Sequence, residues 1–470
     1  MRSVAAKHTQ AFFNRLSHPR PHSTSPLSVV HTRSAVSLLR PRHTSNMSAL
    51  TTISRIVTHP FTTLSIHDTH TAVSSNGTTQ PSATTSPYQW AVIGAGPAGI
   101  ACIGQLLDNN IPPSAILWLD PTFAVGDFGT KWRNVSSNTT VGLFKRFYKQ
   151  CRSFQYSGSD SHGRRYAIES RGDKETCQLE VAAEPLRDVT ARLRSVVTSV
   201  EGEVVRLEQY QQHYRILLST ANSTATTSSA PLLAANVILA TGSQAREAPA
   251  LHTTHPHLTV IPITTALDPH QLVQSITPTD HVLVIGSSHT AVILIRTLLE
   301  QSTAQHVYNA YRDPLRYALY MDDWILFDDT GLKGDTARWS REHLHGLHND
   351  RLTRIYSNET NLNTVLPKIT KIIYATGFER RNISGGIEDL GYNYNYNVNC
   401  GIIAPGLFGC GIGFPEQKID RYGNVEFRVG LWKFMVYIES VLPLWMKYSV
   451  LEGIGQPKGA PGTEKPKANL

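Results

Sequence analysis

The stretch Gln89-Trp-Ala-Val-Ile-Gly-Ala-Gly-Pro-Ala-Gly-Ile100 holds the strongest fold signal in this 470-residue chain. Its apolar run ends in glycine and predicts a buried parallel strand, and the Gly94-x-Gly96-x-x-Gly99 spacing then leads into an apolar helical run. Gly94 permits a tight turn, Gly96 lets the backbone approach a pyrophosphate, and Gly99 lets the helix pack on the strand. Free amides at the helix N-terminus would point at the anion, so the stretch predicts a phosphate cradle.

An acidic residue follows this cradle at an informative distance. The next predicted strand, 115–119, ends in Asp120, about twenty residues past Gly99. A carboxylate at that distance can accept hydrogen bonds from an adenosine ribose. A glycine turn between ordinary core elements would explain the turn but not the acid. The sequence therefore predicts an α/β fold that begins with a dinucleotide-binding unit.

Charge and composition divide the chain. Residues 1–86 hold eight Arg or Lys and a single acid, Asp68, so +7 of the net charge of +8 lies there. This Ser-, Thr- and His-rich segment is typical of a mitochondrial transit peptide and predicts a mitochondrial location, with a cytoplasmic one as the alternative. A chain started at Met47 would still contain every motif, so the start codon stays open. The remainder is nearly neutral, which predicts no nucleic-acid surface.

Other chain-wide features narrow the class of protein. No stretch reaches the roughly eighteen uninterrupted apolar residues that a spanning helix requires, so no transmembrane segment is expected. The most apolar late stretch, 429–450, is interrupted by charges and by Pro443 and predicts amphipathic helices on the core. The five cysteines contain no Cys-x-x-Cys, which argues against a disulfide scaffold and favours a reducing compartment.

A second unit repeats the opening pattern. The run 281–291 again leads from an apolar strand through Gly286 into an apolar helix, with Ser288 and Ala291 where the first unit has its later two glycines. The next predicted strand ends in Arg312, at the place that Asp120 occupies in the first unit. An arginine there suits a 2′-phosphate and favours NADP(H) over NAD(H), although the adjacent Asp313 weakens that preference.

Further segments supply candidate contacts. The polar loop 126–139 offers an aromatic ring and several amide and hydroxyl groups to an extended cofactor. Two predicted strands end in Ala-Thr-Gly, at 240–242 and 375–377, and a Gly-rich segment spans 404–416. Small residues there let the backbone pass close to a bound group. The strand that ends at 375–377 is expected to return the chain to the first domain.

Two groups of titratable residues are not expected to bind a metal. The acidic pairs at 322–323 and 328–329 lack a third metal ligand at a recognisable spacing, so helix capping or an interdomain polar contact is favoured. His343, His345 and His348 would be spread around a helix and would not converge on one ion.

The order of these motifs resembles that of the two-dinucleotide-binding-domain flavoproteins, which include pyridine nucleotide-disulfide oxidoreductases and flavin-dependent monooxygenases. The resemblance covers roughly residues 87–445 and implies two Rossmann-like domains, with an NAD(P)-binding domain inserted in an FAD-binding domain. It implies FAD and NADP(H) as cofactors, with hydride passing from nicotinamide to flavin. The expected segments are a disordered leader at 1–86, the FAD domain at 87–245 and 369–450, the NAD(P) domain at 246–368, and a disordered tail at 451–470.

The motifs and the resemblance together nominate the cofactor-binding residues. Those assigned to FAD are Gly94, Gly96, Pro97, Ala98, Gly99, Asp120, Gly129, Thr130, Trp132, Thr241, Gly242, Thr376, Gly377 and Gly411. Those assigned to NADP(H) are Gly286, Ser288, Ala291 and Arg312.

The cysteines and the polar loop indicate the subfamily. Cys102 and the other four cysteines provide no closely spaced thiol pair for disulfide reduction. The segments 129–132 and 137–139 resemble the flavin-facing loop of the monooxygenases, whose Phe-x-Gly-x-x-x-His signature is absent. In such an enzyme Asn138 would help to shield the oxygen adduct of the flavin.

The sequence therefore predicts an FAD-dependent oxidoreductase that uses NAD(P)H on a small-molecule substrate or acceptor, with monooxygenation as one reaction. The alternatives are a flavin-binding or regulatory protein without nicotinamide turnover, and a reductase that passes electrons to a protein acceptor.

Overall fold

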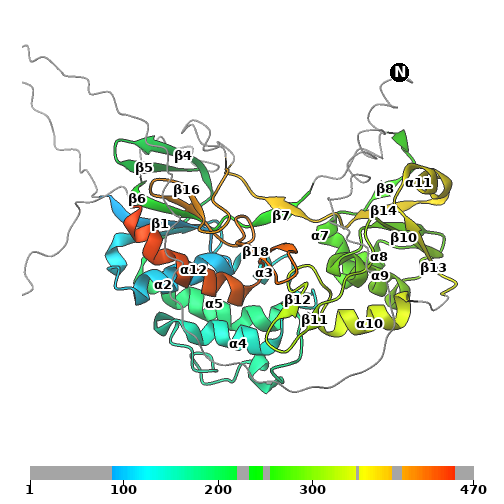
Figure 1. Ribbon diagram of the computed structural model, residues 1–470, viewed down its shortest axis with the longest axis horizontal. Helices are drawn as coiled ribbons and strands as arrows, with labels where there is room; N and C mark the ends of the chain where they lie inside the picture. The colour runs from blue at the N-terminus through cyan, green and yellow to red at the C-terminus, as the bar shows by residue number, and fades with distance from the viewer. Residues whose placement is uncertain (1–86, 220–231, 247–253, 346–348, 384–393, 450–470) are drawn as a thin grey trace, which may run out of the picture. The chain divides into compact units, whose positions relative to one another are not determined.

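The computed structural model describes residues 87–219, 232–246, 254–345, 349–383 and 394–449 (Figure 1). The predicted leader at 1–86, the predicted tail at 451–470 and His348 lie outside these ranges.

The first sheet has eight strands and is built around the opening motif. Its main path runs β16-β17-β6-β1-β2-β3, and the β4–β5 hairpin joins it by pairing β5 with the start of β6. The inner pairs β17–β6, β6–β1, β1–β2 and β2–β3 are parallel. The strands are β1 (Tyr88–Ile93), β2 (Ile116–Asp120), β3 (Thr198–Glu201), β4 (Val204–Tyr210), β5 (His213–Leu218), β6 (Leu232–Leu239), β16 (Ile402–Ala404) and β17 (Leu407–Gly409).

Four helices gather on one face of this sheet, and the β4–β5 hairpin lies toward the other (Figure 1). They are α2 (Pro97–Asp108), α4 (Val141–Gln150), α5 (Leu179–Val196) and α12 (Leu431–Lys447). Their core includes the fully buried Trp118 and Trp445. The helical prediction for 429–450 is confirmed by α12. The segment 145–182, which has no clear periodicity, contains most of α4, two short 3₁₀ turns and the start of α5.

The second sheet has five parallel strands in the order β13-β10-β9-β14-β8. They are β8 (Thr259–Val260), β9 (His281–Ile285), β10 (His306–Tyr311), β13 (Leu352–Tyr356) and β14 (Lys371–Tyr374). The helices are α7 (Ile263–Ala266), α8 (Pro269–Gln274), α9 (His289–Gln301), α10 (Gly334–Leu344) and α11 (Glu359–Val365). The parallel second sheet, the parallel inner strands of the first sheet and the helices beside them confirm the α/β architecture of paired nucleotide-binding domains.

The placement of β14 corrects one prediction. The sequence assigned the strand at 371–374 to the returning part of the first domain, but β14 pairs with β9 and β8 inside the second sheet. A short apolar strand buried on both faces looks the same in sequence whichever parallel sheet it joins. The chain re-enters the first sheet only later, at β16 and β17.

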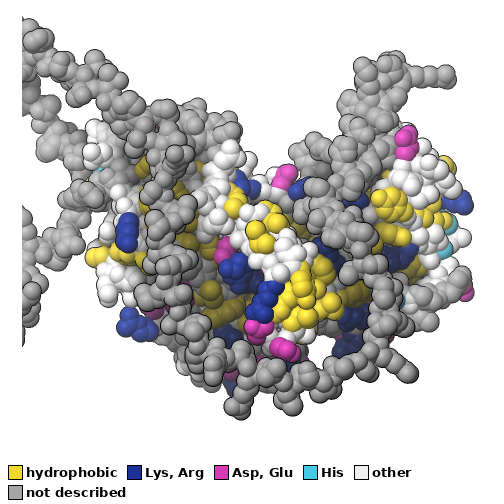
Figure 2. Space-filling view, viewed as in Figure 1, with side chains coloured by type: hydrophobic (Ala, Val, Ile, Leu, Met, Phe, Trp, Pro, Cys, Tyr) yellow, Lys and Arg dark blue, Asp and Glu magenta, His cyan; other side chains and the backbone are white. Residues whose placement is uncertain are grey.

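Three small antiparallel two-stranded sheets complete the fold. They are β7 (Ser243–Ala245) with β15 (Phe378–Arg380), β11 (Leu319–Tyr320) with β12 (Ile325–Leu326), and β18 (Gln417–Ile419) with β19 (Val425–Phe427). Figure 2 shows hydrophobic side chains gathered over β11, β12 and β18. Exposed hydrophobic residues of these small sheets include Tyr320 of β11, Ile419 of β18 and Tyr422 in the turn between β18 and β19. Within the described ranges no helix is both long and apolar enough to cross a bilayer.

Candidate active site

Two positions in the first glycine turn have room only for glycine. Gly94 has a φ of +112°, and a Cβ built on it would lie 2.3 Å from the carbonyl oxygen of Ala240. A Cβ on Gly99 would lie 1.9 Å from the carbonyl oxygen of Gly94. Strand, turn and helix therefore pack backbone to backbone, which brings the N-terminus of α2 over the carboxyl end of β1.

Gly96 differs from its two neighbours because it faces open space. It caps α2, with Pro97 as the first helical residue, and a Cβ built on it would meet nothing within 4 Å. Around it the chain brings further glycines: a Cβ on Gly126 would lie 3.1 Å from the Cα of Gly96, and one on Gly411 would lie 2.6 Å from the Cβ of Ala98. The structure thus gathers glycines from segments more than 300 residues apart at the N-terminus of α2. Their missing side chains leave room there for a pyrophosphate, which the helix amides can bind.

Gly126 was not among the predicted site residues. It lies in the polar loop 126–139, but its approach to Gly96 depends on the turn after β2, where Val125 adopts a left-handed conformation with a φ of +64°. No sequence pattern at that position signals this approach.

The Asp120 carboxylate accepts hydrogen bonds from backbone amides of the two turns beside it. Its Oδ2 accepts a hydrogen bond from the amide of Ala95 at 2.7 Å, and its Oδ1 accepts from the amides of Thr122 and Phe123 at 2.9 and 2.7 Å. The side chain is buried and joins the end of β2 to the glycine turn. Oδ1 is occupied by two amides, whereas Oδ2 accepts from one, so a lone pair on Oδ2 can still accept a hydrogen bond from a ribose hydroxyl.

The two Ala-Thr-Gly strand ends lie at corresponding places and are linked. Gly242 follows β6 with a φ of +76°, Gly377 follows β14 with a φ of +94°, and a Cβ on either would meet nothing within 4 Å. The strands that follow them, β7 and β15, pair with each other. The Thr241 hydroxyl donates to the carbonyl of Arg381 at 2.8 Å, and Thr376 is half-buried. Both strand ends therefore border the point where the chain crosses between sheets.

The second glycine turn repeats the first with less constraint. Gly286 has a φ of +137°, and a Cβ on it would lie 2.4 Å from the carbonyl oxygen of Ala375. Ser288 caps α9 and is exposed, whereas Ala291 is fully buried. The turn thus preserves the one glycine that its backbone contact requires.

Arg312 lies at the exposed end of β10, where the sequence predicts it. Its Nε donates to the Oδ2 of Asp313 at 2.8 Å, and both side chains are about half exposed. The guanidinium keeps further donors for a phosphate.

The polar loop after α3 (Gly126–Gly129) lies between the two parts of the chain. The Trp132 ring packs edge-on against Phe378 at a centroid distance of 5.6 Å. The carbonyl of Gly129 accepts from Arg187 at 3.0 Å, and the Thr130 hydroxyl donates to the carbonyl of Gly126 at 2.9 Å. These contacts fix the position of the loop.

The end of this loop is tied to the inserted part by three side chains. The Asn134 amide donates to Asp268 at 3.1 Å. The Asn138 amide donates to the carbonyl of Gly331 at 3.3 Å, and its Oδ1 accepts from the amide of Lys333 at 3.0 Å. His289, at the start of α9, bonds through Nε2 to the carbonyl of Ser136 at 3.0 Å. We call residues 134–138 the hinge loop.

The acidic pair at 328–329 makes an interdomain polar contact, as the sequence indicated. The Lys433 ammonium of α12 lies 2.5 Å from Asp328 and 2.7 Å from Asp329, and Lys333 also pairs with Asp328. Burial alone would raise the pKa of Asp328, but the two lysines outweigh it and lower that pKa. Burial dominates at Asp329 and raises its pKa. The other pair contributes Asp323, which binds Arg421 at the surface.

The histidines of the α10 region form separate local contacts. His343 Nδ1 bonds to the carbonyl of Trp339 at 2.9 Å and stacks on its indole, whereas His345 packs on Tyr317. In the described part of the chain no group of three His, Cys, Asp or Glu side chains is arranged to hold a metal.

A pair of thiols was missed by the sequence analysis. Cys102 of α2 and Cys410 after β17 are both fully buried, and their sulfurs lie 3.4 Å apart. Sequence spacing reveals only cysteines that are close in sequence, and the separation of 308 residues between these two hides the contact. Burial, with Cys410 beside it, raises the pKa of Cys102 and keeps it a protonated thiol, a poor nucleophile.

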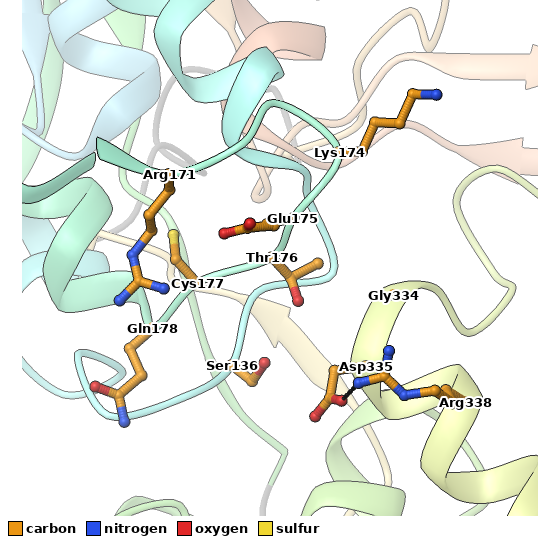
Figure 3. Close-up of a pocket in the computed structure, with 10 residues that line it drawn as sticks. All are labelled: Ser136, Arg171, Lys174, Glu175, Thr176, Cys177, Gln178, Gly334, Asp335 and Arg338. Carbon is orange, nitrogen blue, oxygen red and sulfur yellow. Dashed lines mark hydrogen bonds and ion pairs between the residues drawn. The ribbon is translucent and has the colours of Figure 1, made fainter. Parts of the chain in front are cut away.

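A pocket of about 570 Å³ opens beside the hinge loop (Figure 3). Its walls are Ser136, the segment 171–178 and the N-terminal turn of α10. Glu175 points inward across from Ser136, Lys174 points away, and Asp335 pairs with Arg338 at the rim. The lining is polar and carries both signs of charge.

Comparison with known proteins agrees with this two-domain architecture. Residues 88–319 match the family described as pyridine nucleotide-disulphide oxidoreductase. A monooxygenase from Paecilomyces divaricatus is 30% identical over 413 aligned residues, which cover 76% of this chain and 97% of that protein. This chain belongs to the two-dinucleotide-binding-domain flavoproteins.

Solved structures of other flavoproteins share the fold. The cadaverine monooxygenase of Erwinia amylovora, bound to FAD, has a TM-score of 0.54 at 11% identity, with 81% of this chain and 100% of that chain covered. The ornithine N-hydroxylase of Kutzneria sp. 744 has a TM-score of 0.52 at 10% identity, with 77% and 99% covered.

The glycine-lined site fits the FAD of this flavoprotein family. Gly96, Gly242 and Gly377 leave space that a Cβ would fill, and the N-terminus of α2 supplies amides for a pyrophosphate. The protein is therefore an FAD-dependent oxidoreductase that passes hydride from NAD(P)H to the flavin. Bound FAD supplies the redox chemistry, and the chain supplies binding, orientation and exclusion of water.

Proposed function

We propose that this flavoprotein is an NADPH-dependent monooxygenase that oxygenates a small organic substrate. The observation that carries the proposal is the monooxygenase relative, which is 30% identical along 97% of its own length. The two fold neighbours above are an amine monooxygenase and an N-hydroxylase by name, and they support the same reaction class.

The nominated glycines, with Pro97, Ala98 and Asp120, would hold the ADP portion of FAD at the N-terminus of α2. Gly129, Thr130, Trp132, Thr241, Thr376 and Gly411 would border the rest of the cofactor. Each rests on its sequence motif and on the open backbone around Gly96, Gly242 and Gly377.

The nicotinamide cofactor would bind at the second glycine turn, at Gly286, Ser288 and Ala291. We propose NADPH over NADH because Arg312 lies at the exposed strand end where a 2′-phosphate would be met. Asn138 would keep water from the flavin edge. The Asn138 amide donates one N–H to the carbonyl of Gly331 and accepts from the amide of Lys333. Its second N–H therefore remains to donate to a group at the flavin.

A reductase with a protein acceptor is the second candidate. It is favoured by the match of residues 88–319 to the pyridine nucleotide-disulphide oxidoreductase family. For either function, the composition of residues 1–86 supports a mitochondrial location. N-terminal sequencing of the protein purified from its native cells tests this, because import into mitochondria would remove a transit peptide.

Rapid-mixing absorbance separates the candidates. The FAD-loaded protein is mixed without oxygen with NADPH and, in a separate run, with NADH, and the flavin absorbance band at about 450 nm is followed. We expect faster bleaching with NADPH. Oxygen is then admitted with candidate amine and aromatic substrates, and oxygen consumed is compared with product formed. Product formed in proportion to oxygen supports a monooxygenase. Flavin reduction with no oxygenated product, but with rapid reduction of a protein acceptor, would support the reductase.

A further inference from the structure

His289 occupies an unusual place for a histidine. It is the first residue of α9, directly after Ser288 in the second glycine turn, where the nicotinamide cofactor is expected. Its ring reaches the other part of the chain, since Nε2 lies 3.0 Å from the carbonyl oxygen of Ser136 in the hinge loop. One side chain therefore contacts both the nucleotide turn and the loop that leads from the FAD site.

The contact to Ser136 decides the protonation of the ring. A carbonyl oxygen only accepts hydrogen bonds, so Nε2 must carry the proton. Burial lowers the pKa of His289 and favours the neutral imidazole. In that form Nδ1 has a lone pair and no proton, and it is an acceptor.

This acceptor has no donor. Nδ1 of His289 is buried, and no hydrogen-bond partner reaches it from the described part of the chain. Buried polar atoms in folded proteins are nearly always paired, so an unpaired one beside a ligand turn indicates a ligand group. Other buried polar atoms without a partner, such as Trp90 Nε1 and Ser357 Oγ, do not lie in the glycine turns.

The chemistry of the acceptor selects the ligand group. Phosphate oxygens at neutral pH accept hydrogen bonds and cannot satisfy Nδ1. The donors of a nicotinamide dinucleotide are its ribose hydroxyls and its carboxamide and adenine amino groups. His289 faces the FAD-binding part through Ser136, and the nicotinamide half must approach the flavin for hydride transfer.

We propose that His289 is a binding and positioning residue for NAD(P)H. Its Nδ1 accepts a hydrogen bond from a donor on the nicotinamide-ribose half, while its Nε2–H stays on the Ser136 carbonyl. Occupancy of the nicotinamide site is thereby tied to the hinge loop. This inference requires NAD(P)H binding, and it does not depend on whether the reduced flavin oxygenates a substrate.

Two isosteric substitutions separate the two ring nitrogens. In His289→Gln the amide nitrogen takes the place of Nε2 and can still donate to Ser136, but the acceptor is lost. In His289→Asn the amide oxygen takes the place of Nδ1 and keeps the acceptor, but the reach to Ser136 is lost. His270, which is exposed on α8, gives the control His270→Gln.

The experiment is an equilibrium titration of the full-length, FAD-loaded proteins with oxidised NADP⁺ and NAD⁺, and with 2′,5′-ADP as a probe that lacks the nicotinamide half. FAD content and circular dichroism establish that each variant is folded. We expect His289→Gln to weaken NADP⁺ binding about tenfold, the effect of one lost hydrogen bond, and to leave 2′,5′-ADP binding unchanged. His289→Asn should bind NADP⁺ more tightly than His289→Gln, and His270→Gln should match the wild type.

Three results would overturn the inference. One is NADP⁺ binding by His289→Gln within about twofold of wild type. Another is equal weakening of NADP⁺ and 2′,5′-ADP, which would place the effect on the turn itself. A third is weaker NADP⁺ binding by His289→Asn than by His289→Gln, which would assign the role to the Ser136 contact. A wild-type protein that binds neither nucleotide would instead contradict the hydride-transfer function itself, which distinguishes that outcome from the three above.

Discussion

Lys433 of α12 places its ammonium nitrogen 2.7 Å from the Oδ1 carboxylate oxygen of Asp329. Lys433 also lies 2.5 Å from Asp328, and its side chain is only 13% exposed. The pairing joins the C-terminal helix of the FAD part to a loop of the inserted part. A buried ion pair is costly to break from one side, because the partner is left charged and unpaired.

We therefore expect Lys433→Met to lower the free energy of unfolding by about 3 kcal/mol. Lys418 is the matched control, because its side chain is 61% exposed and lies 3.6 Å from Glu416. Lys418→Met should cost less than about 0.5 kcal/mol. Chemical denaturation of both variants measures the difference, and equal losses in the two would contradict the expectation.

Asp280 predicts a pH dependence of stability. Burial alone would raise its pKa, but hydrogen bonds from Lys371, Thr277 and Thr370 outweigh burial and lower the pKa to about 2. The unfolded carboxyl protonates first as the pH falls, so the stabilisation is complete above about pH 4 and is lost between about pH 4 and pH 2. Its size is about 2 kcal/mol.

Asp280→Asn should thus be less stable than wild type by about 2 kcal/mol near neutral pH, and the gap should narrow by about pH 3. Denaturant unfolding at both pH values tests this. A gap that stays constant or widens in acid would show that another group governs the effect.

Substitutions of Gly96 and Gly99 should affect folding stability and FAD binding differently. A Cβ on Gly96 meets open space, whereas one on Gly99 would lie 1.9 Å from a backbone oxygen. Gly96→Ala should fold with nearly unchanged stability and bind FAD at least about tenfold more weakly, because its methyl fills the pyrophosphate space. Gly99→Ala should lose both stability and FAD. Unfolding of the FAD-free proteins and FAD titration distinguish them, and a Gly96→Ala variant that retains FAD fully would be the contrary result.

The Arg312–Asp313 pair predicts how nucleotide preference can be tuned. The Asp313 carboxylate accepts a hydrogen bond from Arg312 Nε at 2.8 Å, and its negative charge would repel a 2′-phosphate bound there. Asp313→Asn should tighten NADP⁺ binding about two- to fivefold and leave NAD⁺ nearly unchanged, while Arg312→Gln should weaken NADP⁺ selectively. Titrations at low and high salt check this, since the gain should shrink with salt. A parallel change in both nucleotides would argue against a 2′-phosphate contact.

Local signals explain what the sequence could predict. The first strand, turn and helix were found because the pattern around Gly94, Gly96 and Gly99 carries its own steric reasons. The second turn was recognisable from Gly286 for the same reason. Helix α12 also follows from the apolar residues of one continuous segment, 429–450.

Contacts that depend on tertiary structure were not predictable. The strand at 371–374 was placed in the wrong sheet, since pairing partners leave no trace in a short apolar run. The Cys102–Cys410 pair, the approach of Gly126 to Gly96 and the reach of His289 to Ser136 each join segments far apart in the chain. Asn138 was singled out by resemblance, but its bonds to Gly331 and Lys333 required the structure.

The two nucleotide turns differ in how closely helix and turn approach, and this difference bears on residence time. The first turn allows no side chain at Gly99, whereas the second accommodates the methyl group of Ala291 at the corresponding place. The start of helix α9 must therefore stand farther from its turn than the start of α2 does. If both turns bind a pyrophosphate, we expect the nucleotide at the second turn to dissociate faster than the one at the first.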